Sequence, residues 1–114
     1  MKNWTIKDIM EWQLKTFKKA TTRGQMAKWR EEYDEFTAEM KPSKKVLELA
    51  DMFIVACGVC NLNPMLGFEL LHEVYELCMV YNVSDFRLSR AINAKMEVNS
   101  KRKWKETNGK YKDV

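Results

Sequence analysis

Apolar residues recur along this chain with the period of an α-helix, and strand-like alternation is absent. The clearest stripe is spaced three and four residues apart and consists of Met26, Trp29, Tyr33, Phe36 and Met40. This spacing predicts a helix over about 22–40, and weaker stripes predict four more over about 6–20, 44–60, 64–81 and 85–103. No Asn-Gly turn separates two apolar runs, so we expect an all-α fold, a bundle of four to five helices.

Polar residues mark the starts of these helices. Side-chain caps are expected from Thr5, Thr22, Ser43 and Ser84. The helix over 44–60 is apolar on nearly every side from Met52 onward, which predicts the central and most buried helix. After residue 104 the chain is polar and lacks periodicity, so we expect one helical domain over 1–104 and a mobile tail over 105–114.

The composition fits one globular domain, because 46% of the 114 residues are apolar and 32% are charged. Cys57 and Cys60 have CxxC spacing, but they lie in an apolar helical run and His72 is the only histidine. Buried free thiols are therefore favoured over a zinc or redox site. The apolar stretch 52–60 is shorter than the roughly 20 residues of a membrane span. No signal segment is recognisable, so we expect a cytoplasmic protein without a membrane partner.

Two pairs of acids carry the first chemical signal. Glu32 and Glu35 are three residues apart on one predicted helix, and Glu48 and Asp51 repeat this spacing on the next. Each pair shares a helix face, and a tight turn makes the two helices antiparallel, so the four carboxylates can converge. Lysine or arginine partners would be the simplest way to neutralise them. Four converging carboxylates, however, carry more negative charge than one such side chain can neutralise. Oxygen-only ligands favour Mg²⁺, with Mn²⁺ as a substitute.

The predicted helix over 85–103 offers the complementary charge. Its inward stripe begins with Leu88 and Ile92 and continues with Lys95, Asn99 and Arg102. One explanation is that the helix leaves the core there and Lys95 extends to solvent. Beside four carboxylates, a lysine, an amide and a guanidinium instead suit the phosphates of a metal-bound triphosphate.

Further polar and aromatic residues are candidates for contacts with a sugar or base. Gln13 interrupts the apolar stripe of the first helix, where its amide could bond a ligand or merely a backbone carbonyl. Trp12, Trp29 and Trp104 could stack on a base, although Trp29 belongs to an apolar stripe and is more simply a core residue. His72 has no second histidine nearby and is expected at the surface.

The order of these motifs resembles the MazG-like nucleotide pyrophosphohydrolases. Glu-Glu-x-x-Glu at 31–35, a gap of twelve residues and Glu-x-x-Asp at 48–51 resemble the acid signature of that family. The pattern Lys-x-x-x-Asn-x-x-Arg-x-Trp at 95–104 is similar to its C-terminal helix. Trp12-Gln13 with Phe17 is similar to the first helix of its phage and bacterial branch. The resemblance covers about residues 4–104.

This resemblance implies a Mg²⁺-dependent enzyme that hydrolyses a nucleoside triphosphate, ribo or deoxy, to the monophosphate and pyrophosphate. By motif position, the four paired acids would be the magnesium ligands and Glu31 would orient or deprotonate the attacking water. Lys95, Asn99 and Arg102 would hold the phosphates. Glu31 points away from the other acids on a helical wheel, so its role would require a second metal or a partner subunit. The family also implies a homodimer or a dimer of dimers.

A non-catalytic helical module is the alternative. Its acids would form salt bridges to a basic partner, or it would bind a nucleotide without cleaving it; the complete set of motif acids favours the enzyme. The helix over 64–81 has more apolar residues than an outer helix needs, so we expect it to pack on a second copy. These residues are Leu70, Leu71, Val74, Leu77, Cys78 and Tyr81. No nucleic-acid polymer is expected as a partner.

Overall fold

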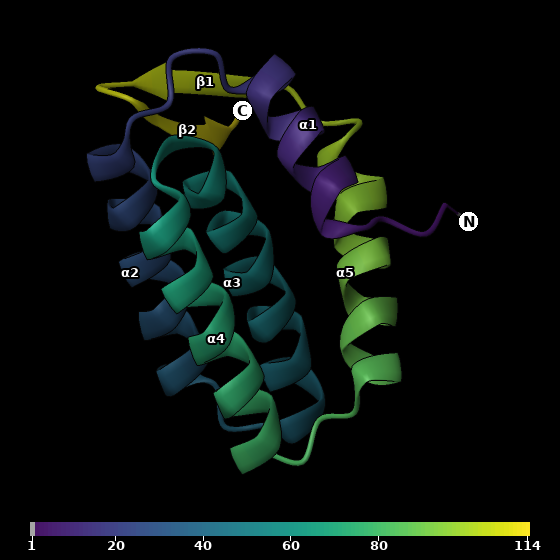
Figure 1. The fold of residues 1–114 in the computed structure, drawn as a ribbon. Helices are drawn as coiled ribbons and strands as arrows, with labels where there is room; N and C mark the ends of the chain where they lie inside the picture. Colours follow the sequence, from purple (N-terminus) through teal and green to yellow (C-terminus); the bar gives the residue numbers. More distant parts are fainter. Residues whose placement is uncertain (1) are drawn as a thin grey trace.

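The computed structural model describes residues 2–114, which form five α-helices followed by a two-stranded hairpin (Figure 1). The helices are α1 (Ile6–Thr16), α2 (Thr22–Ala38), α3 (Pro42–Leu62), α4 (Pro64–Val80) and α5 (Asp85–Asn99). The strands are β1 (Trp104–Thr107) and β2 (Lys110–Asp113). The predicted all-α class is confirmed. Two helices, α1 and α5, end earlier than their apolar stripes predict.

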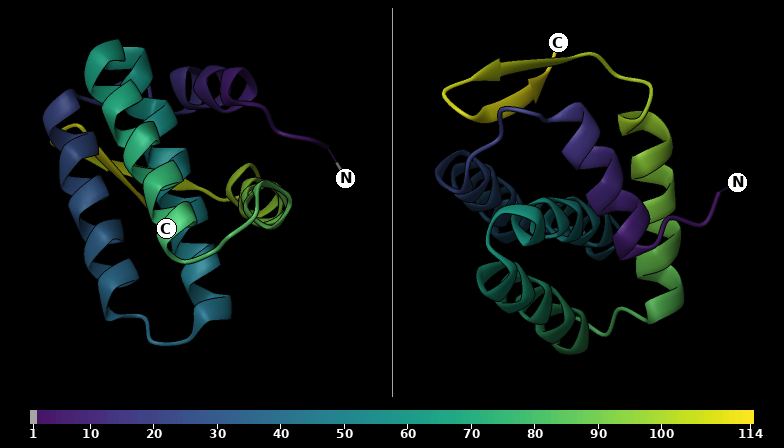
Figure 2. Two further views of the ribbon diagram at one scale, coloured as in Figure 1. Left: turned by 60° about the horizontal axis from the view of Figure 1, so that its bottom comes forward. Right: turned by 45° about the horizontal axis from the view of Figure 1, so that its top comes forward.

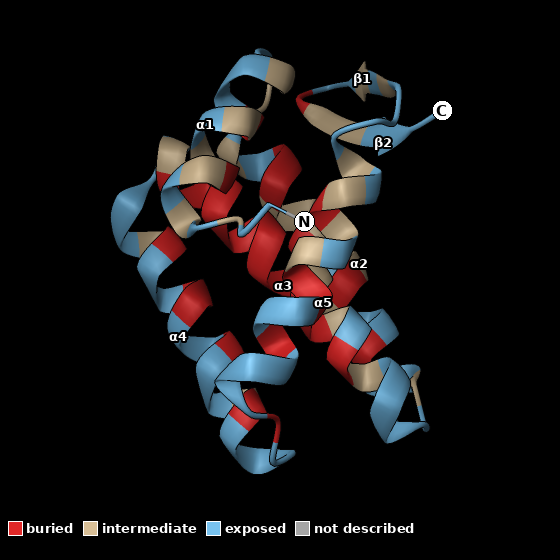
Figure 3. Ribbon diagram, turned by 90° about the vertical axis from the view of Figure 1, so that its right-hand side faces the viewer, coloured by how far each residue is buried: buried red, intermediate tan, exposed pale blue. Residues whose placement is uncertain are grey.

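Helix α3 is the centre of the bundle, as its apolar composition predicts. Every residue from Met52 to Cys60 is buried, and α3 packs against α1, α2, α4 and α5. Figure 3 shows how continuously the buried positions run along this helix, whereas the outer helices carry them on one side. A short turn reverses the chain between α2 and α3, so these two helices lie side by side and antiparallel (Figure 1).

The helix starts agree with the predicted caps in part. Thr5 caps α1 in a capping box with Asp8, and Ser84 caps α5 by accepting from the amide of Arg87. Helix α2 is capped by Thr21 instead of Thr22. Helix α3 starts at Pro42 without a side-chain cap, so the Ser43 cap is wrong. Proline is favoured in the first turn because its φ is already helical and its missing N–H would have no partner there.

The segment 105–114, which we expected to be a mobile tail, mostly forms the hairpin. Strands β1 and β2 pair antiparallel, with Trp104 opposite Asp113 and Lys105 opposite Lys112. The connecting residues Asn108 and Gly109 both have positive φ angles, of 52° and 80°. Two successive residues of this kind make the tight turn whose twist matches paired strands, and Asn-Gly is its preferred sequence.

Contacts with the helical bundle hold this hairpin, since a two-stranded ribbon is marginally stable by itself. The carbonyl oxygen of Gly109 accepts a hydrogen bond from the amide of Thr21 at 3.1 Å. The ring of Tyr111 stacks on Phe17, with centroids 4.6 Å apart. A β-carbon at Gly24 would overlap the carbonyl oxygen of Gly109, so only glycine allows this close approach. Figure 2 shows the hairpin lying across the ends of α1 and α2.

Several smaller predictions from the sequence are confirmed. Cys57 and Cys60 are buried free thiols, Trp29 lies in the core and the His72 side chain is 75% exposed. Within the described residues 2–114, no helix is long and apolar enough to cross a membrane.

The apolar residues of helix α4, on which the prediction of self-association rested, are mostly buried within one chain. Leu70, Leu71, Val74 and Cys78 are buried inside one chain, so they are not free to bind a second copy. Other apolar residues of α4 are exposed along its outer side: Met65, Phe68, Tyr75 and Met79. Self-association stays a prediction, and it now rests on this second set of residues.

Candidate functional site

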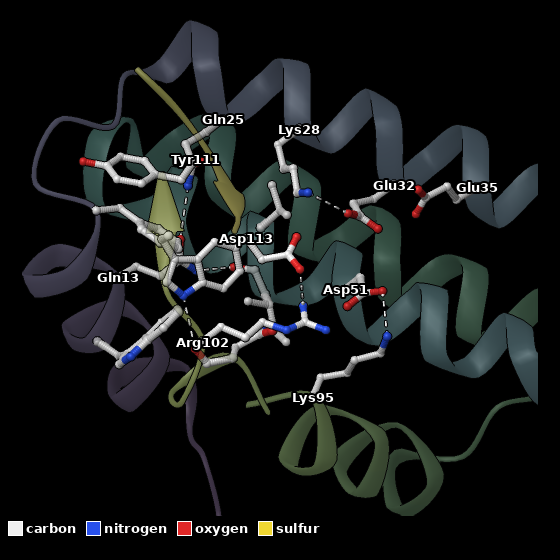
Figure 4. A pocket seen from close by; sticks show the side chains of 16 residues that line it. Gln13, Gln25, Lys28, Glu32, Glu35, Asp51, Lys95, Arg102, Tyr111 and Asp113 are labelled. Atoms are coloured by element: carbon white, nitrogen blue, oxygen red, sulfur yellow. Dashed lines mark hydrogen bonds and ion pairs between the residues drawn. The ribbon is translucent and has the colours of Figure 1, made fainter. Parts of the chain in front are cut away.

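The paired acids of α2 and α3 converge, as their spacing predicts. One carboxylate oxygen each from Glu32, Glu48 and Asp51 lies within 4.8 Å of the other two. Glu35 extends from α2 beside Glu32 (Figure 4) and lines the same cavity. Two i, i+3 pairs on antiparallel neighbouring helices thus place four acids together, three of them in the closest group.

Burial and mutual repulsion disfavour the charged forms of these acids. For Glu32, burial and then the charge of Asp51 raise the pKa to about 8. Burial is also the largest cause that raises the pKa of Glu48, followed by the charges of Asp51 and Glu35. The pKa of Asp51 is raised by burial, against the opposing effect of Lys95. The negative charge of a fully ionised cluster is therefore disfavoured, and at neutral pH Glu32 keeps its proton in the absence of a cation.

Two lysines neutralise part of this charge. The Nζ of Lys95, from α5, lies 3.1 Å from an oxygen of Asp51. The Nζ of Lys28 lies 3.4 Å from Oε1 of Glu32, one helical turn away on α2. Both ion pairs are drawn in Figure 4. Two of the four acids therefore have the lysine partners that the sequence offered as an alternative to a metal.

Two buried carboxylate oxygens are left over. Among residues 2–114, no hydrogen-bond donor reaches Oε2 of Glu32 or Oε2 of Glu48. A buried polar atom without a partner costs on the order of 1–3 kcal/mol, and more when it carries charge. Both residues belong to the closest acidic group, so a cation held among these acids would offer these oxygens the partner they lack. The donor set is oxygen only, which fits Mg²⁺ or Mn²⁺.

Glu31 lies apart from the other acids, as the helical wheel predicts. Its carboxylate forms an ion pair with Lys110 of the hairpin, and the hydrogen bond from that lysine lowers its pKa. Neighbouring residues on α2 thus have pKa values shifted in opposite directions. Glu31 is held as a charged surface group that fixes the hairpin, whereas Glu32 is buried among acids.

A cavity of about 300 Å³ extends from the acids toward the hairpin (Figure 4). Lys95, Asn99 and Arg102 line it, together with Glu32 and Asp51. The three polar residues on the α5 stripe therefore reach the same space as the acids. Arg102 lies just beyond the end of α5, and its Nη1 is 3.7 Å from Oδ2 of Asp113.

Aromatic side chains close the opposite end of this cavity: Trp12, Phe17, Trp104 and Tyr111. Phe17 and Trp104 meet edge to face at 5.1 Å between ring centroids. The indole N–H of Trp104 donates to the backbone oxygen of Asn99 at 3.2 Å, which fixes the ring. All four rings are half-buried, so part of their surface stays open to a ligand.

Gln13 is bound on both sides of its amide. Its Nε2 donates to the backbone oxygen of Ile54, and its Oε1 accepts from Nε2 of Gln25 at 3.1 Å. Both glutamines are buried and line the cavity wall. A β-carbon at Gly58 would overlap Oε1 of Gln13, so the glycine makes room for this pair. The alternative in which the Gln13 amide binds a backbone carbonyl instead of a ligand thus accounts for its position.

The sequence reasoning missed four polar residues of the cavity: Gln25, Lys28, Tyr111 and Asp113. The position of Lys28 four residues before Glu32 on one helix was a readable signal. Asn108-Gly109 was the signal for the hairpin that carries the last two. Comparisons with family models, with curated proteins and with solved structures gave no match to this chain. The MazG-like resemblance therefore rests on its motif residues alone.

Proposed function

We propose that this chain is a Mg²⁺-dependent nucleoside triphosphate pyrophosphohydrolase, which releases pyrophosphate and a nucleoside monophosphate. The observation that carries the proposal is the pair of buried, unsatisfied oxygens of Glu32 and Glu48 beside Asp51. Glu32 and Asp51 line a cavity that Lys95 and Arg102 also line. Anionic and cationic groups side by side suit a ligand that combines a divalent cation with phosphates.

Glu32, Glu35, Glu48 and Asp51 would hold the cation. Mg²⁺ bound there would neutralise charge on the phosphate oxygens and lower the pKa of a bound water. The raised pKa values of Glu32, Glu48 and Asp51 support this assignment, because a cation would replace the repulsion between them with attraction.

Lys95, Asn99 and Arg102 would bind the phosphates. Lys95, which now pairs with Asp51, would be able to contact a phosphate oxygen if a cation took over that carboxylate. Arg102 is exposed enough to turn toward the leaving pyrophosphate, whose charge grows as the bond breaks. Glu31 would orient or deprotonate the attacking water, which requires that Lys110 release it.

A helical interaction module is the second candidate. The exposed apolar residues of α4 favour it, because Met65, Phe68 and Met79 are each more than 60% exposed on one helix. The same surface would serve a homodimer or a dimer of dimers of the enzyme, so it does not by itself separate the two functions.

The test of the proposed function is pyrophosphate release across a panel of ribo- and deoxyribonucleoside triphosphates, with Mg²⁺, with Mn²⁺ and with a chelator. We expect release that depends on the metal. A thermal-shift series with a non-hydrolysable triphosphate accompanies it, since a ligand that binds the folded state raises the Tm. A flat thermal response and no release with any triphosphate would rule out the enzyme and favour the interaction module.

A further inference from the structure

The hairpin presents two chemically different faces. Side chains alternate along a strand, and residues directly opposite each other in a ladder share a face. Trp104 and Asp113 are opposite each other and line the cavity, and Tyr111 of the same face joins them. Lys105 and Lys112 are likewise opposite each other, and they line a separate groove on the far side of the hairpin. Asp113, at the end of β2, lines this groove as well. The two faces therefore differ in the aromatic rings of one and the lysines of the other, with Asp113 at their common edge.

The cavity-facing side of the hairpin offers a flat surface bounded by hydrogen-bond acceptors. Tyr111 is fixed by its stack on Phe17 and by its hydroxyl, which accepts from the amide of Lys19 at 3.0 Å. Asp113 contributes a carboxylate, which only accepts when ionised. Gln25 turns its amide nitrogen to Gln13, which leaves its amide oxygen as an acceptor beside the cavity. A flat ligand that carries several N–H donors fits this combination.

Asp113 keeps its acceptor capacity next to Arg102. The separation of 3.7 Å is an ion pair rather than a short hydrogen bond. The guanidinium offsets the charge that Asp113 would otherwise bring close to a phosphate-bearing ligand. Arg102 therefore lies between the phosphate region of the cavity and its aromatic end, which sets the orientation of a nucleotide: phosphates toward Asp51, base toward the hairpin.

We propose that Asp113 binds the Watson–Crick edge of a guanine base held against Trp104 and Tyr111, and that the site selects guanine nucleotides. The inference rests on the proposed function, because it places the phosphates at the acidic end. Guanine presents two adjacent donors, N1–H and the N2 amino group, which match the two oxygens of a carboxylate. Adenine and cytosine place an acceptor beside their amino group, and uracil and thymine flank one N–H with two carbonyls. A carboxylate pairs with only one donor of each.

The test compares guanine with hypoxanthine, which lacks only the N2 amino group. The kcat/KM for pyrophosphate release is measured with guanosine and inosine triphosphates and Mg²⁺, for the wild type, Asp113→Asn and Lys105→Gln. We expect the wild type to favour guanosine about tenfold, since the lost contact is to a charged but half-exposed group. Asp113→Asn should bring that ratio to about one. Lys105→Gln, on the other face of the same hairpin, should leave it unchanged.

The ratio cancels any general effect of the substitutions on folding or on the Arg102 contact. Calorimetric titration with guanosine and inosine monophosphates, without metal, repeats the comparison on binding alone. Rapid cleavage of both triphosphates at equal rates would overturn the inference and leave the proposed function standing. Release from neither, while another triphosphate of the panel is cleaved, would likewise overturn the inference alone. No release from any triphosphate would overturn the proposed function, and the monophosphate titration would then decide the base preference: equal affinities overturn it, and tighter guanosine binding supports it.

Discussion

The two ends of the cavity are built from different kinds of structure. The acidic end consists of side chains on α2 and α3, which lie in the middle of long, mutually packed helices. The aromatic end depends on the hairpin, whose connection to the bundle is a few contacts near Phe17, Thr21 and Gly24. Local stability follows the density of buried contacts, so the first end is rigid and the second can open separately.

This difference suits the proposed roles of the two ends, namely metal binding at the acidic end and selection of the base at the hairpin end. A metal site needs ligands held within a few tenths of an ångström, which rigid helices supply. A base site on the hairpin, which lies outside the helical core, would be able to vary in sequence without disturbing that core. The ion pair of Glu31 with Lys110 is one of the few contacts that join the two regions across the front of α2.

The largest effect is expected at the acidic end. Glu48→Gln should lower the rate of pyrophosphate release by about 100-fold or more, because even residues behind a metal ligand affect activity by roughly 10–100-fold. The Tm without metal should hold or rise, because the substitution removes a carboxyl whose charged form is disfavoured. Both are measured in parallel with Glu73→Gln, an exposed residue of α4 that should change neither. Near-normal turnover of Glu48→Gln at saturating Mg²⁺ would contradict the metal assignment.

A second substitution should separate the two ends. In Gly24→Ala the new β-carbon overlaps the backbone of Gly109, which cannot turn aside as a side chain could. We expect the hairpin to leave its position and the KM for a triphosphate to rise roughly tenfold, the cost of one charge-assisted contact. Hydrogen exchange provides the direct measurement: amides over 104–113 should lose protection.

The amides of α3 serve as the internal control in the same experiment. They should keep their protection, because alanine is a better helix former than glycine by about 1 kcal/mol and the bundle core is untouched. If α3 and the hairpin lose protection together, the two regions form one cooperative unit and the hairpin does not open separately.

The same division explains what could be predicted from the sequence. The convergence of Glu32 with Glu48 follows from helical spacing and a short turn, both of which are local. The hairpin has only Trp104 and Tyr111 as large apolar residues, and its stability comes from contacts with Phe17 and Thr21, about ninety residues away in the chain. Asn-Gly signals a turn, but between polar segments it carries no sign of the partner surface. Of the cavity residues on the hairpin, Trp104 was a candidate from its residue type, whereas Tyr111 and Asp113 were beyond local pattern reading.

The smallest expected effect is on the pH dependence of stability, in which Glu32 and its neighbour Glu31 should act in opposite directions. The folded-state pKa of Glu32 is about 8, above the ordinary value of 4.5, so the folded state holds a proton that the unfolded state loses. Without metal, stability should therefore fall as the pH rises from about 4.5 to 8. The pKa of Glu31 is lowered, so its contribution to the stability of the fold is present above pH 4.5 and lost in acid.

In chelator, the Tm of the wild type should drop by several degrees between pH 5 and pH 8. Glu32→Gln should reduce this slope, of which the raised pKa values of Glu48 and Asp51 keep a part. Glu31→Gln should leave the slope unchanged and lower the Tm slightly at every pH in the range. A wild-type Tm that stays constant or rises over this interval would mean that Glu32 is already paired in the metal-free protein, and the acidic end would then need no cation.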